Sequence, residues 1–159
     1  SQQDATLAGF DIHAAWRPAR WLELSGTVQY VDGELDDGTQ TPLLPPLKAS
    51  AAVEVSRAEL GVAESPFLRI GLVWADDQQS SGPLEPFNQF DEPSPPFGTA
   101  STSSYTLVNL HAGATLGPVM VTFGIENLFD EEYRDFLDTY KIITLGPGRN
   151  FGLRTSVAF

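Results

Sequence analysis

Acidic side chains at alternate positions are the first residues of this chain whose spacing could do chemistry. Asp32, Glu34 and Asp36 lie in the stretch DGELDDG, and calcium loops carry oxygen ligands at alternate positions. The match to an EF-hand is poor, because Gly38 falls one place late and position twelve is Leu43 rather than Glu. A solvated acidic loop is therefore the better interpretation, and no metal is expected.

Two histidines, His13 and His111, are the other candidates for chemistry. By strand parity both face the polar side, where they could bind haem or a metal chelate. Neither has a spaced partner of the kind a metal site needs, so hydrogen bonding to neighbouring residues is the favoured interpretation. The sequence has no cysteine and no Ser-His-Asp spacing, paired-carboxylate motif, nucleotide-binding Gly loop or HExxH. We therefore expect no enzyme activity and no cofactor.

Aromatic rings in two long segments, 76–104 and 127–148, are the better candidates for ligand contact. Exposed rings on loops commonly hold a ligand that has an apolar or planar body. The alternative is that these rings pack the loops against one another. The candidate ligand-binding residues are Phe87, Phe90, Phe97, Phe136 and Tyr140.

The charge and hydropathy of the chain exclude several classes of partner. A net charge of -12 and a pI near 4.3 argue against nucleic acid, which requires clustered Lys and Arg. The sequence has no run of about 20 apolar residues, so no transmembrane helix is predicted. A transmembrane β-barrel is compatible with the sequence. The first residues have no signal-peptide pattern, so an exported protein would carry its signal upstream.

Seven segments alternate apolar and polar residues with period two, which predicts an antiparallel all-β protein whose strands each have one apolar and one polar face. Short and long connections follow one another in strict alternation, so one rim carries turns and the other carries long loops, as in outer-membrane barrels. The strand segments are 8–16, 22–30, 47–55, 68–74, 108–116, 119–126 and 150–159. The short connections are 17–20, 58–66 and 117–118, and the long ones are 33–46, 76–104 and 127–148.

Aromatic residues mark both ends of these strands. Trp16 and Phe159 fall at the turn rim, whereas Tyr30, Trp74 and Phe151 fall near the loop rim. Two aromatic bands a strand's length apart are typical of a membrane barrel, because amphipathic rings prefer the headgroup level. A β-sandwich with aromatics at its ends is the alternative.

The stretch GIENLFDEEY at 124–133 resembles the C-terminal end of a TonB-dependent outer-membrane receptor. In that family the penultimate strand commonly ends in an Asn-Leu-Phe-Asp turn followed by Tyr, and the last strand follows a Pro-Gly-Arg and ends on Phe. The opening hairpin and the stretch PLLPPLKASAAVEV also resemble this family's barrel. The motif residues, for which a structural role is expected, are Asn127, Leu128, Phe129, Asp130, Tyr133 and Arg149.

The resemblance implies a 22-stranded barrel in the bacterial outer membrane, with a plug domain in its lumen. Residues 1–159 would form the last seven strands, with the plug and the earlier strands absent, because an odd number of strands cannot close an up-and-down barrel. The implied function is import of a scarce small-molecule ligand such as a ferric siderophore. The implied partners are the TonB complex, reached through the absent plug, and outer-membrane lipid.

The terminal Phe159 has a further implied role. In outer-membrane proteins generally, the barrel-assembly machinery recognises a last strand with alternating apolar residues and a terminal aromatic. Phe159 would then be an assembly signal, or else simply an aromatic of the girdle. The alternative function for the whole chain is a non-transporting β-domain, either a small adhesion barrel or a soluble carbohydrate-binding sandwich.

Overall fold

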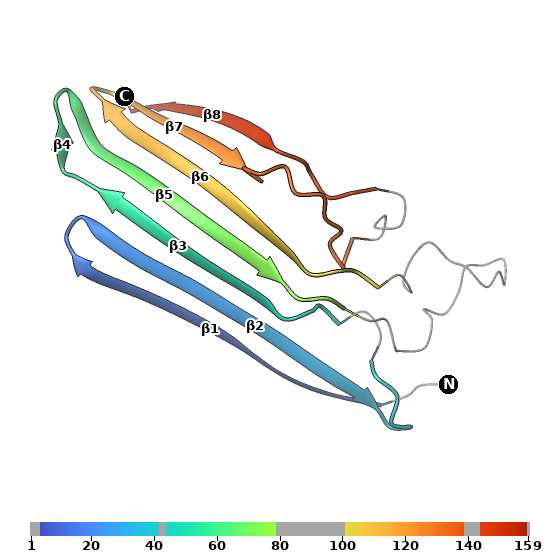
Figure 1. The fold of residues 1–159 in the computed structure, drawn as a ribbon. Coiled ribbons are helices and arrows are strands. Elements are labelled where there is room, and N and C mark those ends of the chain that lie inside the picture. Colours follow the sequence, from blue (N-terminus) through green and yellow to red (C-terminus); the bar gives the residue numbers. More distant parts are fainter. Residues whose placement is uncertain (1–3, 42–43, 79–100, 139–143, 159) are drawn as a thin grey trace.

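The computed structural model describes residues 4–41, 44–78, 101–138 and 144–158, and their strands form one antiparallel sheet (Figure 1). Seven long strands follow one another in the sheet, as the sequence predicts, and an eighth of two residues lies beside β5. The strands are β1 (Ala5–Ala19), β2 (Leu22–Leu35), β3 (Lys48–Ser56), β4 (Glu59–Leu60), β5 (Ala63–Ala75), β6 (Tyr105–Leu116), β7 (Val119–Glu126) and β8 (Asn150–Val157).

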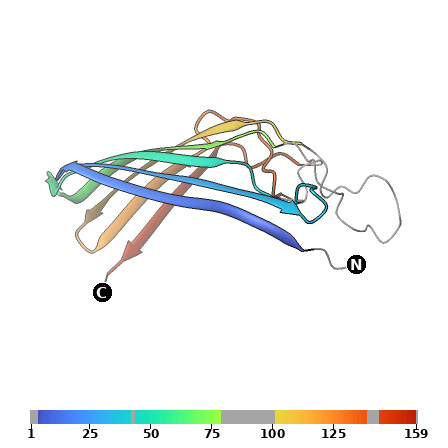
Figure 2. The same ribbon diagram turned by 90° about the horizontal axis from the view of Figure 1, so that it is seen from below.

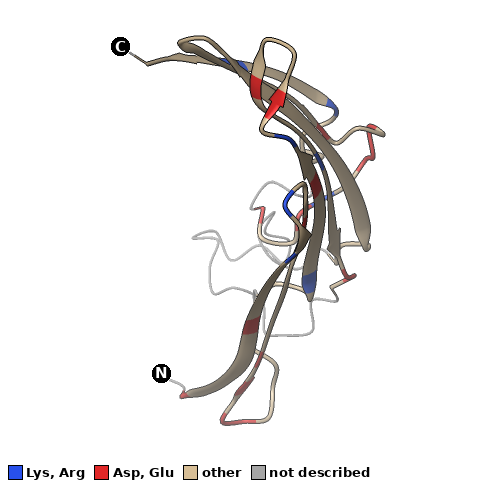
Figure 3. Ribbon diagram, turned by 90° about the vertical axis from the view of Figure 1, so that its left-hand side faces the viewer, with Lys and Arg blue, Asp and Glu red and all other residues tan. Residues whose placement is uncertain are grey.

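The long strands pair in the order β1-β2-β3-β5-β6-β7-β8, which leaves β1 and β8 at the two edges. The sheet is a single curved layer, and Figures 2 and 3 show the curve from two directions. Short connections gather at one end, here called the turn rim, and long connections gather at the other, the loop rim (Figure 1). Within the described ranges, no helix has the length and apolar character needed to cross a membrane.

Strand register confirms the predicted alternation. Ile70 on β5 lies opposite Val53 on β3 and Leu110 on β6, so apolar side chains continue from strand to strand. The next position along, Arg69, lies opposite Glu54 and His111. The strands pair antiparallel, and register shifts occur only near the turn rim, between Trp16 and Ala19 and between Glu64 and Phe67. Over the rest of the sheet one face is therefore apolar and the other is polar.

The exposure of the two faces is the reverse of a soluble domain. Ile70 is 50% exposed, and apolar side chains on the other strands are similarly open. On the polar face, Lys48, Glu54 and Arg69 in the middle of the sheet are 27 to 37% exposed, whereas His13 and Asp11 on the edge strand β1 are 66% and 53% exposed. Side chains converge on the inside of a curve and spread on its outside, so we place the polar face on the inside of the arc in Figure 3.

The connection predicted at 58–66 is shorter in the structure than in the prediction. β4 and the start of β5 pair there, with Leu60 opposite Ala63. Gly61 has a φ of 63° and supplies the left-handed residue that such a tight turn needs. The sequence stretch suggested a loop because Pro66 interrupts it, but the Pro66 carbonyl accepts a hydrogen bond from the Arg57 backbone N–H at 3.0 Å. Pairing continues to the end of the hairpin.

β1 and β2 also extend further toward the loop rim than the apolar pattern predicted. Ala5 pairs with Leu35 at the far end of this hairpin, well beyond the expected end at residue 30. Asp32 and Glu34 interrupt the apolar pattern there, but backbone hydrogen bonds do not depend on side-chain polarity. The strands therefore project past the apolar zone.

Candidate functional site

Phe136 is the one ligand-binding candidate that falls within the described residues. Its ring is only 2% exposed, so it lies inside the folded loop rather than on the surface. This position agrees with the packing alternative for Phe136. The other four candidates, Phe87, Phe90, Phe97 and Tyr140, and the terminal Phe159 lie outside the described residues.

Asn127 holds the two ends of the last long connection together. Its side-chain Nδ2 donates to the Glu131 carbonyl at 2.9 Å and to the Pro147 carbonyl at 3.2 Å. Its Oδ1 accepts a hydrogen bond from the Glu131 N–H at 2.8 Å. The backbone of Asn127 has a φ of 51°, a left-handed conformation that Asn tolerates better than most residues. The start of the loop is thereby fixed to its end.

The same residue fixes the loop to the sheet. The Asn127 backbone N–H donates to Asn109 Oδ1 at 2.9 Å, and the Leu128 N–H donates to the Val108 carbonyl at 2.7 Å. Both contacts continue the β6 edge past the end of β7. Asn127 is 3% exposed, so these are buried polar groups with partners, which is the condition under which burial of polar atoms is tolerated.

Asp130 and Arg149 form a second contact between the start and the end of the connection between β7 and β8. Asp130 has a φ of 59°, and its Oδ1 accepts a hydrogen bond from the Arg149 N–H at 2.7 Å. The Arg149 guanidinium lies 3.8 Å from the other carboxylate oxygen. A Cβ on Gly148 would lie 2.9 Å from Asp130 Oδ1, so the close approach requires glycine. Phe129, the remaining aromatic of the motif, is largely exposed.

Tyr133 packs the loop against β6. Its ring centroid lies 4.6 Å from that of Tyr105, the first residue of β6. Its carbonyl accepts a hydrogen bond from the Gly146 N–H at 2.8 Å. A Cβ on Gly146 would lie 2.4 Å from the Tyr133 ring, so this position also requires glycine.

Asp135 joins the loop to two separate strands. Its Oδ2 lies 2.7 Å from Lys48 Nζ on β3 and accepts a hydrogen bond from the Tyr105 hydroxyl on β6 at 3.1 Å. Its Oδ1 accepts a hydrogen bond from the Leu137 N–H at 3.0 Å. Because β5 lies between β3 and β6, the loop reaches across three strands on the polar face.

The surroundings of Asp135 keep its carboxyl group ionised. Burial by itself raises the pKa of the Asp135 carboxyl, but hydrogen bonds from Lys48 and the Leu137 N–H, with the Lys48 charge, hold its pKa below the ordinary value. Burial and the neighbouring Asp135 charge raise the pKa of the Tyr133 phenol. At neutral pH a carboxylate and an ammonium therefore face each other beside neutral phenols.

Most of the remaining polar-face charges contact a side chain of the same strand or of the adjacent strand. Arg69 lies 3.5 Å from Glu54 and donates to Ser25 Oγ at 3.3 Å. His111 Nε2 lies 2.9 Å from Glu126, and His13 Nε2 lies 2.9 Å from Asp11. Glu23 pairs with Arg17, and Arg154 lies beside β7 opposite Thr122.

Both histidines therefore contact an acidic group of their own chain, as the favoured interpretation expects. In the parts of the chain that the structure describes, no three His, Cys, Asp or Glu side chains come together as a metal site would require.

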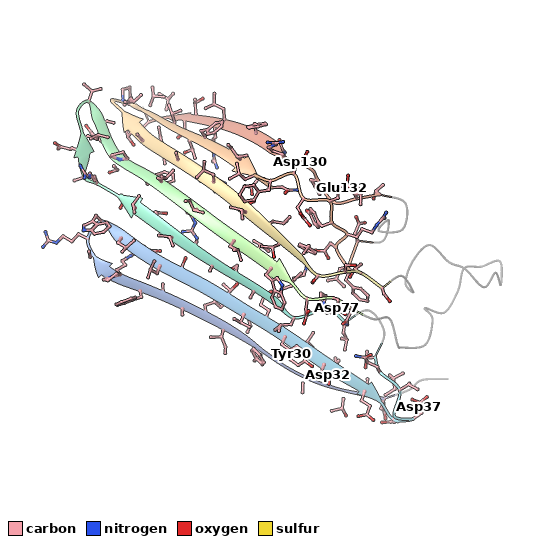
Figure 4. All side chains as sticks on the ribbon, viewed as in Figure 1. Tyr30, Asp32, Asp37, Asp77, Asp130 and Glu132 are labelled. Atoms are coloured by element: carbon pink, nitrogen blue, oxygen red, sulfur yellow. The ribbon has the colours of Figure 1, made fainter. Side chains whose placement is uncertain are left out.

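Acidic residues gather at the loop rim. Asp32, Asp37, Asp77, Asp130 and Glu132 all lie at this end of the sheet (Figure 4). The three long segments 32–47, 76–104 and 127–149 together carry fourteen acidic and three basic residues. These three segments of the sequence therefore carry most of the chain's acidic residues.

The sequence motif predicts the residues at the base of the loop, but not the contact of Asp135 with Lys48 and Tyr105 that attaches the loop to β3 and β6. The motif pointed directly to Asn127 and Asp130. Lys48, Tyr105 and Asp135 carry no motif, and their contact depends on how far the loop folds back over the sheet.

No protein-family model and no curated protein matches the sequence. Solved structures do match its fold. The copper transporter OprC matches 100% of this chain with a TM-score of 0.79 and 18% identity, over 24% of its own length. The ferric yersiniabactin uptake receptor FyuA from Yersinia pestis matches 99% of this chain with a TM-score of 0.71 and 18% identity, again over 24% of its length.

A chain of the FpvAI-pyocin S2 complex matches 96% of this chain with a TM-score of 0.70 and 16% identity, over 19% of its length. The sheet has the fold of a TonB-dependent receptor barrel. This chain spans a quarter or less of the structures that it matches. A sandwich would need a second packed sheet, whereas the long strands described here all belong to one.

Proposed function

We propose that this chain is the C-terminal part of the barrel of a TonB-dependent receptor, and that the whole protein imports a scarce ligand across the bacterial outer membrane. The observation that carries the proposal is the sheet itself. One curved layer exposes its apolar face on the outside and its ion pairs on the inside, and nearly its whole length matches a segment of such barrels. Lipid would cover the apolar face.

The chain supplies only part of the barrel in this proposal. β1 and β8 are the sheet's edges, and an unpaired edge exposes a row of backbone donors and acceptors. Further strands of the same protein would pair with β1 and β8 and close the barrel. A plug domain outside this chain would contact the polar face and carry the segment that engages the TonB complex.

The loop rim would face the cell exterior and take part in ligand capture. The base of the connection between β7 and β8 is held in place by Asn127, Asp130 and Asp135, so this one loop of the rim can present its outer residues at a defined position. The proposed ligand contacts remain Phe87, Phe90, Phe97 and Tyr140. Phe136 is buried, so it would support these contacts by packing inside the loop. The excess of acidic groups suits a cationic ligand or metal complex better than an anionic one.

Two of the matched structures carry ligand names, copper in one and ferric yersiniabactin in the other. We take a metal or metal chelate as the ligand class, with a ferric siderophore of neutral or positive net charge as the first candidate. The barrel-assembly machinery would recognise the strand that ends at Phe159.

Uptake in whole cells tests the proposal. Cells grown under iron limitation would be given ⁵⁵Fe-siderophores or ⁶⁴Cu, with the gene present, deleted or restored, and with TonB deleted. We expect accumulation of one probe that disappears in both deletion strains and returns on complementation. Accumulation that is equal in all strains for every probe would overturn the transport proposal.

A further inference from the structure

A cavity of about 800 Å³ lies at the turn rim, far from the loops. It is formed where the β1-β2 turn meets the neighbouring hairpin of β3, β4 and β5 (Figure 1). Its lining combines two arginines with aromatic and aliphatic side chains. These include Arg20, Trp21, Val55, Arg57, Leu60 and Leu68.

Register explains why a cavity forms there. β2 begins with Leu22 opposite Val55, and the Ser56 N–H donates to the Trp21 carbonyl at 2.9 Å. The β3-β5 hairpin then continues past this contact through β4 to Gly61, whereas the first hairpin has already turned. The second hairpin projects beyond the first, and the cavity occupies the step between them.

The two arginines of the cavity are exposed and are not paired with an acidic side chain of the described residues. Among the described residues, no ion pair joins Arg20 or Arg57 to a carboxylate, whereas Arg17 at the same rim pairs with Glu23. The nearby acids, Glu59 and Glu64, lie opposite each other on the hairpin and outside the cavity lining. Segments 17–21 and 56–66 carry three arginines and two acids, in contrast to the acidic loop rim.

The apolar part of the cavity continues the outer face of the sheet. Val55 and Leu68 pair with each other at the turn-rim end of the apolar rows. Leu60 is 61% exposed and Trp21 is 55% exposed, so both are open at the mouth of the cavity. An aromatic ring beside cationic groups at the end of an apolar zone is the pattern of a membrane interface.

We propose that this cavity binds an anionic phospholipid of the inner leaflet of the outer membrane. Its phosphate would lie against Arg20 and Arg57, and its acyl chains would run along Val55 and Leu68. Guanidinium groups bind phosphate through paired N–H donors, and basic pockets beside membrane-spanning segments bind anionic headgroups in the same way. The inference rests on the proposed function in one respect, since it requires the turn rim to lie at the inner leaflet.

Native mass spectrometry of the whole purified receptor tests the site, with phosphatidylglycerol and phosphatidylcholine as the two probes. The double variant Arg20→Gln/Arg57→Gln removes both cationic groups. Arg17→Gln is the matched control, because it removes one arginine that is already paired. We expect wild type and the control to prefer phosphatidylglycerol, and the double variant to bind it roughly tenfold more weakly.

Two results would overturn the inference. Equal binding of phosphatidylglycerol to wild type and the double variant would show that the arginines do not form the site. Full competition by glycerophosphoglycerol at the same concentration as the lipid would show a site for soluble anions and not for lipid.

Migration with and without boiling, together with uptake, separates this inference from the proposed function. If the receptor shifts on heating and transports its ligand while lipid binding is unchanged in the double variant, the lipid site alone is wrong. If the whole product is absent from the outer membrane, the proposed function fails and the lipid site fails with it.

Discussion

Asn127 serves the loop through its side chain and its backbone together. The side chain satisfies the Glu131 N–H and two carbonyls, while the backbone holds a left-handed φ. Asn127→Gly keeps the conformation but loses the three hydrogen bonds, whereas Asn127→Asp keeps the acceptor and loses the donors. These separate functions make the residue a sensitive test of the loop's base.

We expect Asn127→Ala to lower the free energy of unfolding of the whole receptor by about 2 to 4 kcal/mol, because buried groups lose their partners and alanine strains the backbone. Asn127→Gly should be less damaging than alanine, because glycine keeps the left-handed φ. Asn127→Asp should be the most damaging of the three at neutral pH, because a buried carboxylate oxygen would face the Glu131 and Pro147 carbonyl oxygens. Urea unfolding in detergent or lipid measures the series. An alanine variant as stable as wild type would contradict this account of the loop.

Asp135 should make the loop's attachment depend on pH. Its pKa in the folded state is below the unfolded value, so ionisation stabilises the attachment above the ordinary carboxyl pKa of about 4. That contribution is lost as the pH falls through the folded-state pKa. We expect the protection of segment 127–138 against hydrogen exchange, measured relative to the intrinsic exchange rate at each pH, to fall in this acidic range.

Asp135→Asn should raise exchange in the same segment by about tenfold already at pH 7 and should abolish this part of the pH dependence, since the charged hydrogen bond is removed. Glu132→Gln, another acid at the loop rim, is the control and should leave the acid-induced change in place. Unchanged exchange in Asp135→Asn would mean that other contacts hold the loop.

Only part of this site could be predicted from the residues alone. Asn127 and Asp130 were predicted because they belong to a short motif that resembles the end of the penultimate strand in a known family, although their contacts to Pro147 and Arg149 could not be read from it. The Lys48–Asp135 contact could not be found, because it joins segments far apart in sequence and depends on the curvature of the sheet. The burial of Phe136 has the same origin.

The strands were predictable where their two faces differ in polarity. Alternation depends on neighbouring residues, so β3, β6 and β7 were located to within a few residues. β4 and the outer part of β2 were missed, because pairing there continues by backbone hydrogen bonds without an apolar pattern. Polarity alone therefore underestimates strand length at both rims.

The last strand, β8, carries the assembly prediction. Its register with β7 leads the chain to the turn rim, where Ala158 donates to the Pro118 carbonyl at 3.0 Å. We expect deletion of Phe159 in the whole protein to lower the folded yield in the outer membrane severalfold, because the proposed signal for assembly is lost. Heat-modifiable protein in the outer-membrane fraction measures this yield. Phe159→Tyr keeps an aromatic end and is the control. A deletion that assembles as well as wild type would leave Phe159 no part in assembly.

The sheet as a whole has one apolar and one polar face, and the proposed function places lipid against the apolar face. Ile70 and Gly71 are neighbours on β5 that face opposite sides, and a Cβ on Gly71 would meet nothing within 4 Å. In the membrane account Ile70→Lys costs about 2 to 4 kcal/mol of unfolding free energy, as lysine does at the middle of a bilayer.

Gly71→Lys places the same charge at the same depth on the polar face and should cost much less. Unfolding of both variants in lipid provides the comparison. On the surface of a soluble domain Ile70→Lys would fall within about 0.5 kcal/mol of wild type, and that result would count against lipid on the apolar face.

The most direct measurement of the central claim is spin-label accessibility along β5 in the whole receptor in lipid. The chain has no cysteine, so single cysteines at positions 68 to 73 report one site each once any cysteines elsewhere in the protein are replaced. The account predicts strict alternation, with labels at Leu68, Ile70 and Leu72 open to lipid-soluble oxygen and closed to a water-soluble nickel reagent. High access of the nickel reagent together with low access of oxygen at Leu68, Ile70 and Leu72 would contradict a membrane-facing sheet.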